Sequence, residues 1–156
     1  MTIPNTIHEY LNRAGVPYDV MVHKRTGCAL ANAHTAHIPA AILAKGVLLK
    51  YANGYILAAV PASHQVRLEE VGSCLHQPVA LASEQEVTDL FKDCAPGAIP
   101  AIGDAYEINT IIDDRLEGQN DIFFEGGDHY SLIHIDGPDF DEITDDCFHA
   151  NISMRH

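Results

Sequence analysis

One stretch, residues 45–61 with the sequence KGVLLKYANGYILAAVP, constrains the fold more than any other part of the chain. It consists of two apolar runs on either side of Asn53-Gly54, a dipeptide that supplies the positive φ angles of a type I′ turn. The stretch therefore predicts a β-hairpin. The apolar residues Val47–Leu49 are consecutive, which indicates that both faces of the first strand are buried. We therefore expect this strand in the middle of a sheet.

The other predicted elements combine short strands with amphipathic helices. Helices are predicted over residues 2–15 (capped by Thr2 and ended by Gly15), 28–37, 63–75, 83–92 (with a Ser83–Glu86 capping box) and after Pro138. Strands are predicted over residues 18–23, 78–82, 109–114, 121–127 and 130–136. Strands outnumber helices and several are joined as hairpins. This pattern predicts an α+β or mixed α/β fold, with helices on a mainly antiparallel sheet rather than a doubly wound parallel one.

Composition bounds the class of protein. The 156 residues show no linker or compositional shift, so residues 1–156 are expected to form a single domain. No apolar run approaches the roughly 20 residues that cross a bilayer, and the N-terminus lacks a signal pattern, so we expect a soluble, cytoplasmic protein. The cysteines lack a Cys-x-x-Cys pair and are interpreted as structural thiols: Cys28, Cys74, Cys94 and Cys147.

The chain is strongly acidic, with 22 Asp and Glu against 9 Lys and Arg and a formal net charge of -13. Such a charge repels polyanions at long range. The acidity is also compatible with a role in solubility alone. A nucleic acid would have to be bound locally, through few phosphate contacts.

Four side chains stand out as candidates for chemistry. Lys45 begins the buried hairpin strand, where it supplies a fixed positive charge to a cleft or extends into solvent. His129 follows two glycines at a predicted turn, where it faces a ligand or water. Asp113 and Asp114 close an apolar strand, and because alternate strand residues face opposite sides, one of them could point into a cleft. Either could instead simply end the strand.

Several common kinds of site are not predicted. His34 and His37 could share one face of a helix, but no third ligand accompanies them at a convincing spacing, so no metal site is predicted. The sequence has no Gly-x-Ser-x-Gly elbow, P-loop or dinucleotide fingerprint. Neither a serine nucleophile nor a cofactor is therefore expected.

A glycine-rich segment, GAIPAIG at residues 97–103, follows the predicted helix 83–92. Glycine lets the backbone approach a ligand closely and leaves its N–H groups able to donate hydrogen bonds. Pro100 restricts the same segment. The segment is therefore a candidate to hold a carbonyl oxygen on which negative charge develops.

Four segments in this order resemble the YbaK-like aminoacyl-tRNA deacylases, which are relatives of the editing domain of bacterial prolyl-tRNA synthetases. They are LAKGVLLKYANGYILAAVPASHQV, LASEQEVTDLFKDCAPGAIPAIG, IIDDRL and FFEGGDHYSLIHI. The resemblance covers roughly residues 15–145 and rests on several motifs in order. It implies a compact domain with a mixed, mainly antiparallel sheet flanked by helices.

The resemblance also implies site residues. Lys45 resembles the functionally important lysine of the family, Asp114 its acidic pocket residue, with Asp113 as the alternative, and His129 the histidine of the synthetase editing domain. The substrate-contacting loop corresponds to Gly97, Ala98, Ile99, Pro100 and Ala101, closed by Gly103. The family loop usually has a second proline where this chain has Ala101.

The implied activity is trans-editing, the hydrolysis of the ester of a mischarged aminoacyl-tRNA by a positioned water or the substrate's ribose hydroxyl. The expected partners are the tRNA acceptor end and an aminoacyl-tRNA synthetase, with neither DNA nor a membrane. Cations expected to help are Lys24, Arg25, Lys45 and Lys50. Two alternatives are a noncatalytic module that binds an aminoacyl group or small metabolite, and a hydrolase of small esters.

Overall fold

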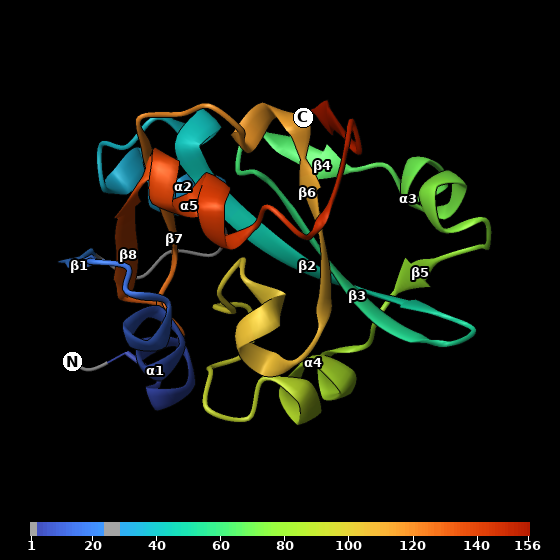
Figure 1. The fold of residues 1–156 in the computed structure, drawn as a ribbon, viewed down its shortest axis with the longest axis horizontal. Helices are drawn as coiled ribbons and strands as arrows, with labels where there is room; N and C mark the ends of the chain where they lie inside the picture. The colour runs from blue at the N-terminus through green and yellow to red at the C-terminus, as the bar shows by residue number, and fades with distance from the viewer. Residues whose placement is uncertain (1–2, 24–28) are drawn as a thin grey trace.

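The computed structural model describes residues 3–23 and 29–156 (Figure 1). The helices are α1 (Asn5–Ala14), α2 (Ala29–Thr35), α3 (Leu68–Leu75), α4 (Glu84–Leu90) and α5 (Gly137–Ile143), with short 3₁₀ helices η1 (Ala40–Ile42), η2 (Gly103–Tyr106) and η3 (Asp114–Leu116). The strands are β1 (Asp19–Val22), β2 (Leu43–Tyr51), β3 (Gly54–Pro61), β4 (His64–Val66), β5 (Ala80–Leu81), β6 (Asn109–Asp113), β7 (Asp121–Glu125), β8 (Ser131–Asp136), β9 (Phe148–Ala150) and β10 (Ser153–Arg155).

The main sheet has the order β1-β8-β7-β2-β3-β6-β9, and β5 also pairs with β2. The pairs β1-β8, β7-β8, β2-β3 and β2-β5 are antiparallel, whereas β2-β7, β3-β6 and β6-β9 are parallel. Strands β4 and β10 form a separate antiparallel pair. The predicted fold class, a mixed sheet flanked by helices, is confirmed.

The predicted hairpin is confirmed as β2 and β3, with β2 in the centre of the sheet, but the predicted turn is wrong. Tyr51 pairs with Gly54, so the turn is made by Ala52 and Asn53, and neither of these has a positive φ. The turn is therefore not type I′ at Asn53-Gly54. Buried cross-strand pairs such as Leu49 with Ile56 set the register and outweigh the preference of the dipeptide.

The predicted helix over residues 63–75 is also wrong in its first part. Residues His64–Val66 form β4, which pairs with β10 almost ninety residues further along the chain, and α3 begins only at Leu68. Strands β9 and β10 were not predicted at all. Both are short, and the partner strands that stabilise them lie far away in sequence.

The remaining predicted helices are present, with small differences at their ends. α1 ends at Gly15 in the left-handed conformation, while the predicted cap Thr2 and residue Cys28 lie outside the described residues. α4 begins with the predicted capping box, in which the Glu86 N–H donates to Ser83 Oγ at 3.1 Å and the Ser83 N–H donates to Glu86 Oε1 at 2.9 Å. None of the helices in the described residues has the length and apolar character that a bilayer-spanning helix needs.

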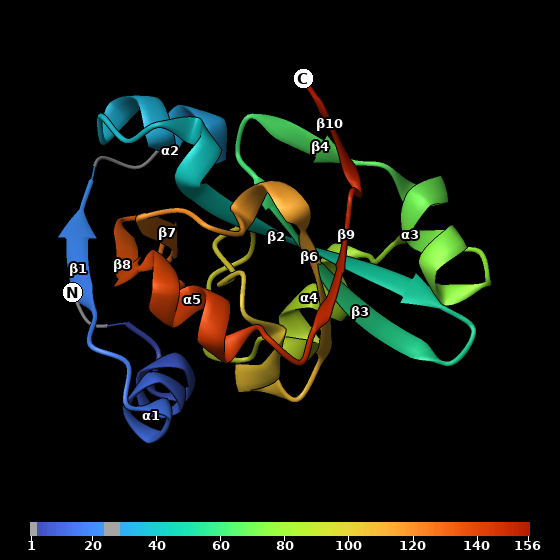
Figure 2. The same ribbon diagram turned by 45° about the horizontal axis from the view of Figure 1, so that its top comes forward.

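Strand β2 carries buried side chains on both faces of the sheet. Ala44 packs with residues of α1 and α5, and Leu48 packs with Phe91 after α4. Leu43 packs with α2 on the opposite face, where Leu49 packs with α3. Helices therefore cover both faces of the sheet (Figure 2). Side chains of successive β2 residues point to opposite faces.

Candidate active site

The candidate site lies where β2 separates from its neighbour β7. These parallel strands pair only at Leu43–Ala44 with Phe123–Phe124, and β5 pairs with β2 further along, at Leu49–Lys50. Within the described residues, no strand pairs with residues 45–48 of β2 on this side. The loop at residues 95–103, drawn in yellow near the centre of Figure 1, packs against this part of β2 at Gly46.

Two contacts fix this loop across the opening. The Ala95 N–H donates to the Gly127 carbonyl oxygen at 2.7 Å, which ties the loop to the turn after β7. At the other end, a Cβ on Gly46 would lie 3.1 Å from the Pro100 carbonyl oxygen, so the loop packs directly on β2. Glycine at position 46 permits this close approach.

The predicted loop residues divide into two groups. Gly97 is exposed and has a φ of +81°, a conformation that favours glycine. Ala98 and Ala101 are fully buried, and Gly103 is anchored because its N–H donates to Thr110 Oγ1 at 3.1 Å. A Cβ on Gly103 would lie 2.4 Å from that same oxygen. The structure therefore places Gly97 at the surface of the site, with the buried residues supporting it.

A cavity of about 330 Å³ lies between the loop, β2, β5 and α4. Its apolar wall comes from Val47, Leu48, Leu81, Val87 and Ile99. Gly97 contributes backbone to the wall, and Glu84 is the charged side chain among the described lining residues. The volume and apolar wall suit a small organic group such as an amino-acid side chain.

His129 lies directly against Gly97. The His129 Cε1 atom is 3.4 Å from the position that a Cβ on Gly97 would occupy. His129 has a φ of +67°, which is uncommon for a residue other than glycine. Asp128 holds the turn, because its Oδ1 accepts from the backbone N–H groups of Tyr130 at 2.9 Å and Ser131 at 2.7 Å. The structure thus brings together two predicted residues, Gly97 and His129, and His129 has a costly backbone conformation of the kind found at functional sites.

Lys45 lies one residue from Gly46 but leaves the strand on the opposite face, because successive strand side chains alternate. Its Nζ is 3.1 Å from His156 Nε2, near the end of the chain. The described lining of the apolar cavity does not include Lys45. The Lys45 side chain therefore lies on the face of β2 opposite the one against which the loop packs.

The two candidate aspartates lie elsewhere. The Asp113 side chain is fully buried and accepts from Ser153 Oγ at 2.7 Å, from the Arg115 N–H at 2.9 Å and from the Ile152 N–H at 3.1 Å. Asp114 is exposed and lines a separate hollow with acidic residues and His149. The described lining of that hollow includes no residue of the loop, so the structure brings neither carboxylate to Gly97.

Glu125 is a site candidate that the sequence reasoning missed. It ends β7, its side chain is 4% exposed, and its Oε1 accepts a hydrogen bond from Asn32 Nδ2. Among the described residues, its Oε2 has no hydrogen-bond partner. Burial raises the pKa of Glu125, against the hydrogen bond from Asn32. A charged residue directly after the apolar run at residues 122–124 was the available sequence signal.

Glu125 also shares a face with Lys45. Leu43 pairs with Phe123 and Ala44 with Phe124, so Glu125 occupies the next register position after the last pair, as Lys45 does on β2. Residues Leu43 and Phe123 pack on the same face, and alternation returns Lys45 and Glu125 to it. The face of the sheet opposite the loop therefore carries one cationic side chain, Lys45, and one carboxyl side chain, Glu125.

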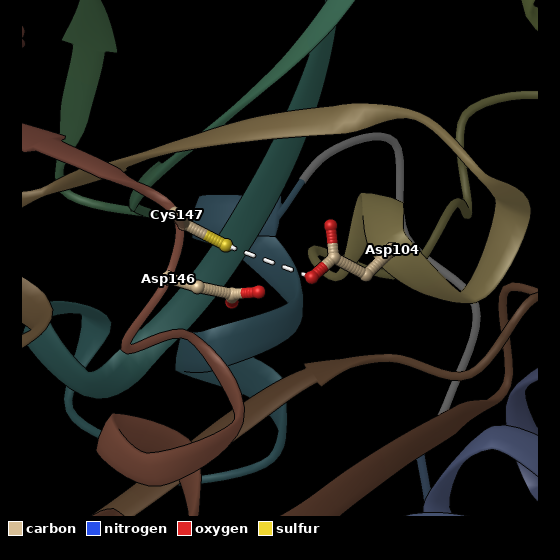
Figure 3. Close-up of side chains that lie close together, drawn as sticks. All are labelled: Asp104, Asp146 and Cys147. Atoms are coloured by element: carbon tan, nitrogen blue, oxygen red, sulfur yellow. Dashed lines mark hydrogen bonds between the residues drawn. The ribbon is translucent and has the colours of Figure 1, made fainter.

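Two other groups have the spacing of metal ligands among the described residues. One is Asp121, His134 and Asp136, and the other is Asp104, Asp146 and Cys147. Figure 3 shows the second group, with Cys147 Sγ 3.8 Å from Asp104 Oδ2. Neither group includes a loop residue, and neither includes His34 or His37. Both are therefore separate from the site around Gly97.

The fold belongs to a known class of domain. A family model described as the aminoacyl-tRNA editing domain matches residues 24–143. The chain therefore belongs to the aminoacyl-tRNA editing domain family, and the resemblance found in the sequence is confirmed. No curated protein sequence matches the chain at a significant level.

Solved structures show the same fold at low sequence identity. The hypothetical protein APE2540 is similar with a TM-score of 0.82 and 18% identity, over 96% of this chain and 100% of that chain. A protein provisionally described as a trans-editing enzyme for prolyl tRNA synthetase is similar with a TM-score of 0.82 and 19% identity, over 96% of this chain and 95% of that chain. At these identities the likeness concerns the fold.

Proposed function

We propose that this protein is a trans-editing deacylase that hydrolyses the ester bond of mischarged aminoacyl-tRNA. The observation that carries the proposal is the contact between Gly97 and His129 beside a cavity of about 330 Å³. Membership of the editing domain family supports the same activity. Gly97 and Ile99, which line this cavity, are proposed to contact the substrate, and Pro100 and the other buried loop residues are proposed to support them.

The loop suits a carbonyl oxygen that gains negative charge. The Ala98 N–H donates to the Ala95 carbonyl oxygen at 3.1 Å, but no backbone hydrogen bond between described residues uses the N–H of Gly97 or Ile99. Such N–H groups stabilise an oxyanion when they are held in place before the reaction. Pro100, packed on Gly46, restricts the movement of the loop.

The proposed reaction needs no enzyme nucleophile. A water molecule, assisted by the neighbouring ribose hydroxyl, attacks the ester carbonyl, the tetrahedral intermediate collapses, and the ribose oxygen leaves with a proton. With water as the attacking group, the products are the free amino acid and uncharged tRNA. In this proposal His129, which lies beside Gly97, accepts and returns the proton. Burial raises the pKa of Cys94 to about 12 and that of Cys147 to about 12, so both thiols stay protonated and are poor nucleophiles.

The position of Lys45 favours contact with a phosphate over contact with the oxyanion. Because its side chain leaves β2 on the face opposite Gly46, it is better placed for a phosphate of the 3′ end than for the oxyanion at the loop. We propose that the size of the cavity sets the selectivity, because pocket size discriminates well against larger side chains and poorly against smaller ones. Alanine, serine and cysteine are therefore candidate acyl groups.

The test is a panel of aminoacylated tRNAs incubated with the purified protein at low salt, with loss of the ester followed over time. We expect turnover of one or more tRNAs that carry small amino acids. Absence of turnover across the panel, together with saturable binding of a small ligand, would support a noncatalytic binding module instead. Equal turnover of amino-acid esters that lack tRNA would indicate a general esterase.

A further inference from the structure

The few cations of this acidic chain are unevenly distributed. Of the 9 Lys and Arg residues, Lys24 and Arg25 lie outside the described residues. Three of the others form ion pairs with surface carboxylates: Arg13 with Glu9 at 3.7 Å, Lys50 with Glu86 at 3.0 Å, and Arg67 with Glu70 at 3.1 Å. These three are partly neutralised where they stand.

Three further cations gather with two histidines around the β4-β10 pair. We name this group the C-terminal basic cluster, and its members are Lys45, His64, Arg115, Arg155 and His156.

Backbone pairing assembles the cluster from distant parts of the chain. Arg155 lies directly opposite His64, so their side chains share a face. The His156 N–H donates to the Ser63 carbonyl oxygen at 3.1 Å, and the His156 ring lies against Lys45. Figure 2 shows the chain end beside β4 and β10.

Arg115 joins the cluster through the segment before β10. Its Nη1 donates to Asn151 Oδ1 at 2.8 Å and lies 3.3 Å from Asp113 Oδ1. The Asp113 carboxylate is fully buried and shared with the donors of β10, whereas the Arg115 side chain is 42% exposed. The Arg115 guanidinium is therefore accessible to solvent, and the Asp113 carboxylate is not.

The pKa of His64 responds to these neighbouring positive charges. Burial lowers the pKa of His64, Arg115 lowers it further, and Arg155 and His156 add to that effect against the opposing charge of Asp113. Three neighbouring basic side chains therefore lie within electrostatic reach of His64, on a protein whose formal net charge is -13.

Lys45 precedes Gly46, on which the loop packs, although the Lys45 side chain leaves β2 on the opposite face. We propose that the C-terminal basic cluster binds phosphates of the tRNA acceptor strand while the esterified 3′ end occupies the loop and cavity. The inference rests on the proposed function and names the part of the substrate that this surface recognises. Arginine suits phosphate because its guanidinium donates two parallel hydrogen bonds.

The test compares Arg115→Gln/Arg155→Gln with the matched control Arg13→Gln/Lys92→Gln, which has the same change in net charge elsewhere. With a turnover-competent charged tRNA, the cluster variant is expected to raise KM about tenfold at about 0.1 M salt, with kcat nearly unchanged. Its slope of log affinity against log salt should become shallower by about 1.4, at roughly 0.7 for each lost single-strand phosphate contact. The control should change neither quantity beyond about twofold.

Two further arms isolate the phosphate contribution. An aminoacyl ester of adenosine without phosphate should be hydrolysed equally by wild type and cluster variant. Inorganic phosphate at millimolar concentration should not inhibit the hydrolysis of charged tRNA by wild type. An equal loss of activity on both substrates, or an equal loss in the control, would overturn the inference. Arg155→Gln alone, at an exposed position, tests the same point if the double variant is unstable.

Failure of the proposed function gives a different result. If wild type hydrolyses no charged tRNA, the binding of uncharged tRNA is measured by fluorescence anisotropy at low salt. Weaker binding by the cluster variant than by its control supports the phosphate surface even then. Equal binding by the two variants rejects it.

Discussion

Two buried carboxylates end two strands of the same sheet, and they differ in how many hydrogen bonds they receive. Asp113, at the end of β6, receives hydrogen bonds from the backbone of Arg115 and Ile152 and from the Ser153 hydroxyl. Glu125, at the end of β7, receives one from Asn32, and its second oxygen has no partner among the described residues. A buried polar group without a partner costs free energy, whereas a saturated one stabilises its surroundings.

This difference indicates that Asp113 and Glu125 have different roles. Asp113 fastens the C-terminal segment to the sheet and so brings Arg155 and His156 to the edge of the opening beside Lys45. Glu125 stands two residues before Gly127, to which the loop is tied. We infer that Asp113 stabilises the fold. Within the part of the chain that the structure describes, Glu125 keeps a carboxyl oxygen without a hydrogen-bond partner, a local cost of the kind that proteins accept at functional sites.

The largest expected effect is on stability, at Asp113. Asp113→Ala leaves several buried donors without their acceptor, so the free energy of unfolding should fall by about 3 kcal/mol. Urea denaturation at pH 7 measures it, and Asp114→Ala next to it should change the free energy of unfolding by less than about 0.5 kcal/mol. A small loss at Asp113, equal to that of its neighbour, would remove the contrast between the two carboxylates.

The next effect is on activity, at the turn that follows Glu125. His129→Asn keeps a residue that tolerates a positive φ but cannot accept and return a proton as imidazole does. Its kcat on a turnover-competent charged tRNA should fall about 100-fold, or about 2.7 kcal/mol in activation free energy. The matched control is His76→Asn, at an exposed helix end where His76 has a φ of 57°.

The control variant should retain the activity and stability of wild type within about twofold and about 0.5 kcal/mol. If His129→Asn keeps wild-type kcat, the imidazole takes no part in the proton transfer. If both histidine variants lose activity equally, the loss reflects backbone strain rather than chemistry.

A smaller effect concerns pH and Glu125. Its pKa is raised in the folded protein, so the folded state holds the proton to a higher pH than the unfolded chain does. The stability contributed by that proton is complete below the unfolded pKa of about 4.5 and is lost as pH rises through the folded pKa. Glu125→Gln removes this dependence, at about 1.4 kcal/mol for each unit of pKa shift.

Urea unfolding at pH 4, 5, 6, 7 and 8 tests this. The free energy of unfolding of Glu125→Gln, minus that of wild type, should increase with pH across this range. The raised pKa of Asp104 is present in both proteins and cancels in the difference. A difference that stays constant with pH would show that burial does not perturb Glu125.

The central hairpin, the capped helix α4 and the mixed sheet could be predicted because their signals are local. Continuous apolar residues in β2 and the Ser83–Glu86 pair each specify one element within a few residues. The strands β4, β9 and β10 could not be predicted, since each is three residues long and depends on a partner far away in sequence. The turn at Ala52 and Asn53 was mispredicted because buried pairs set its register.

The site was predictable to a similar extent. The glycine-proline loop and His129 follow from residue type and local turn signals, and the structure places Gly97 against His129. The side on which Lys45 emerges depends on the register between β2 and the loop, which no local pattern encodes. Glu125 was missed because its burial and its bond to Asn32 arise only from tertiary packing.

The smallest expected effect is at Asp114, which the family resemblance assigns to the pocket. Its exposed carboxylate lines a hollow whose described lining includes Glu117, Asp141 and His149 but no loop residue. Asp114→Asn should therefore change kcat and KM on a charged tRNA by less than about twofold, well within about 0.5 kcal/mol. A loss of tenfold or more in kcat, with the unfolding free energy unchanged, would mean that the carboxylate reaches the substrate. In that case η3 would belong to the site, and the division of labour between the ends of β6 and β7 would be wrong.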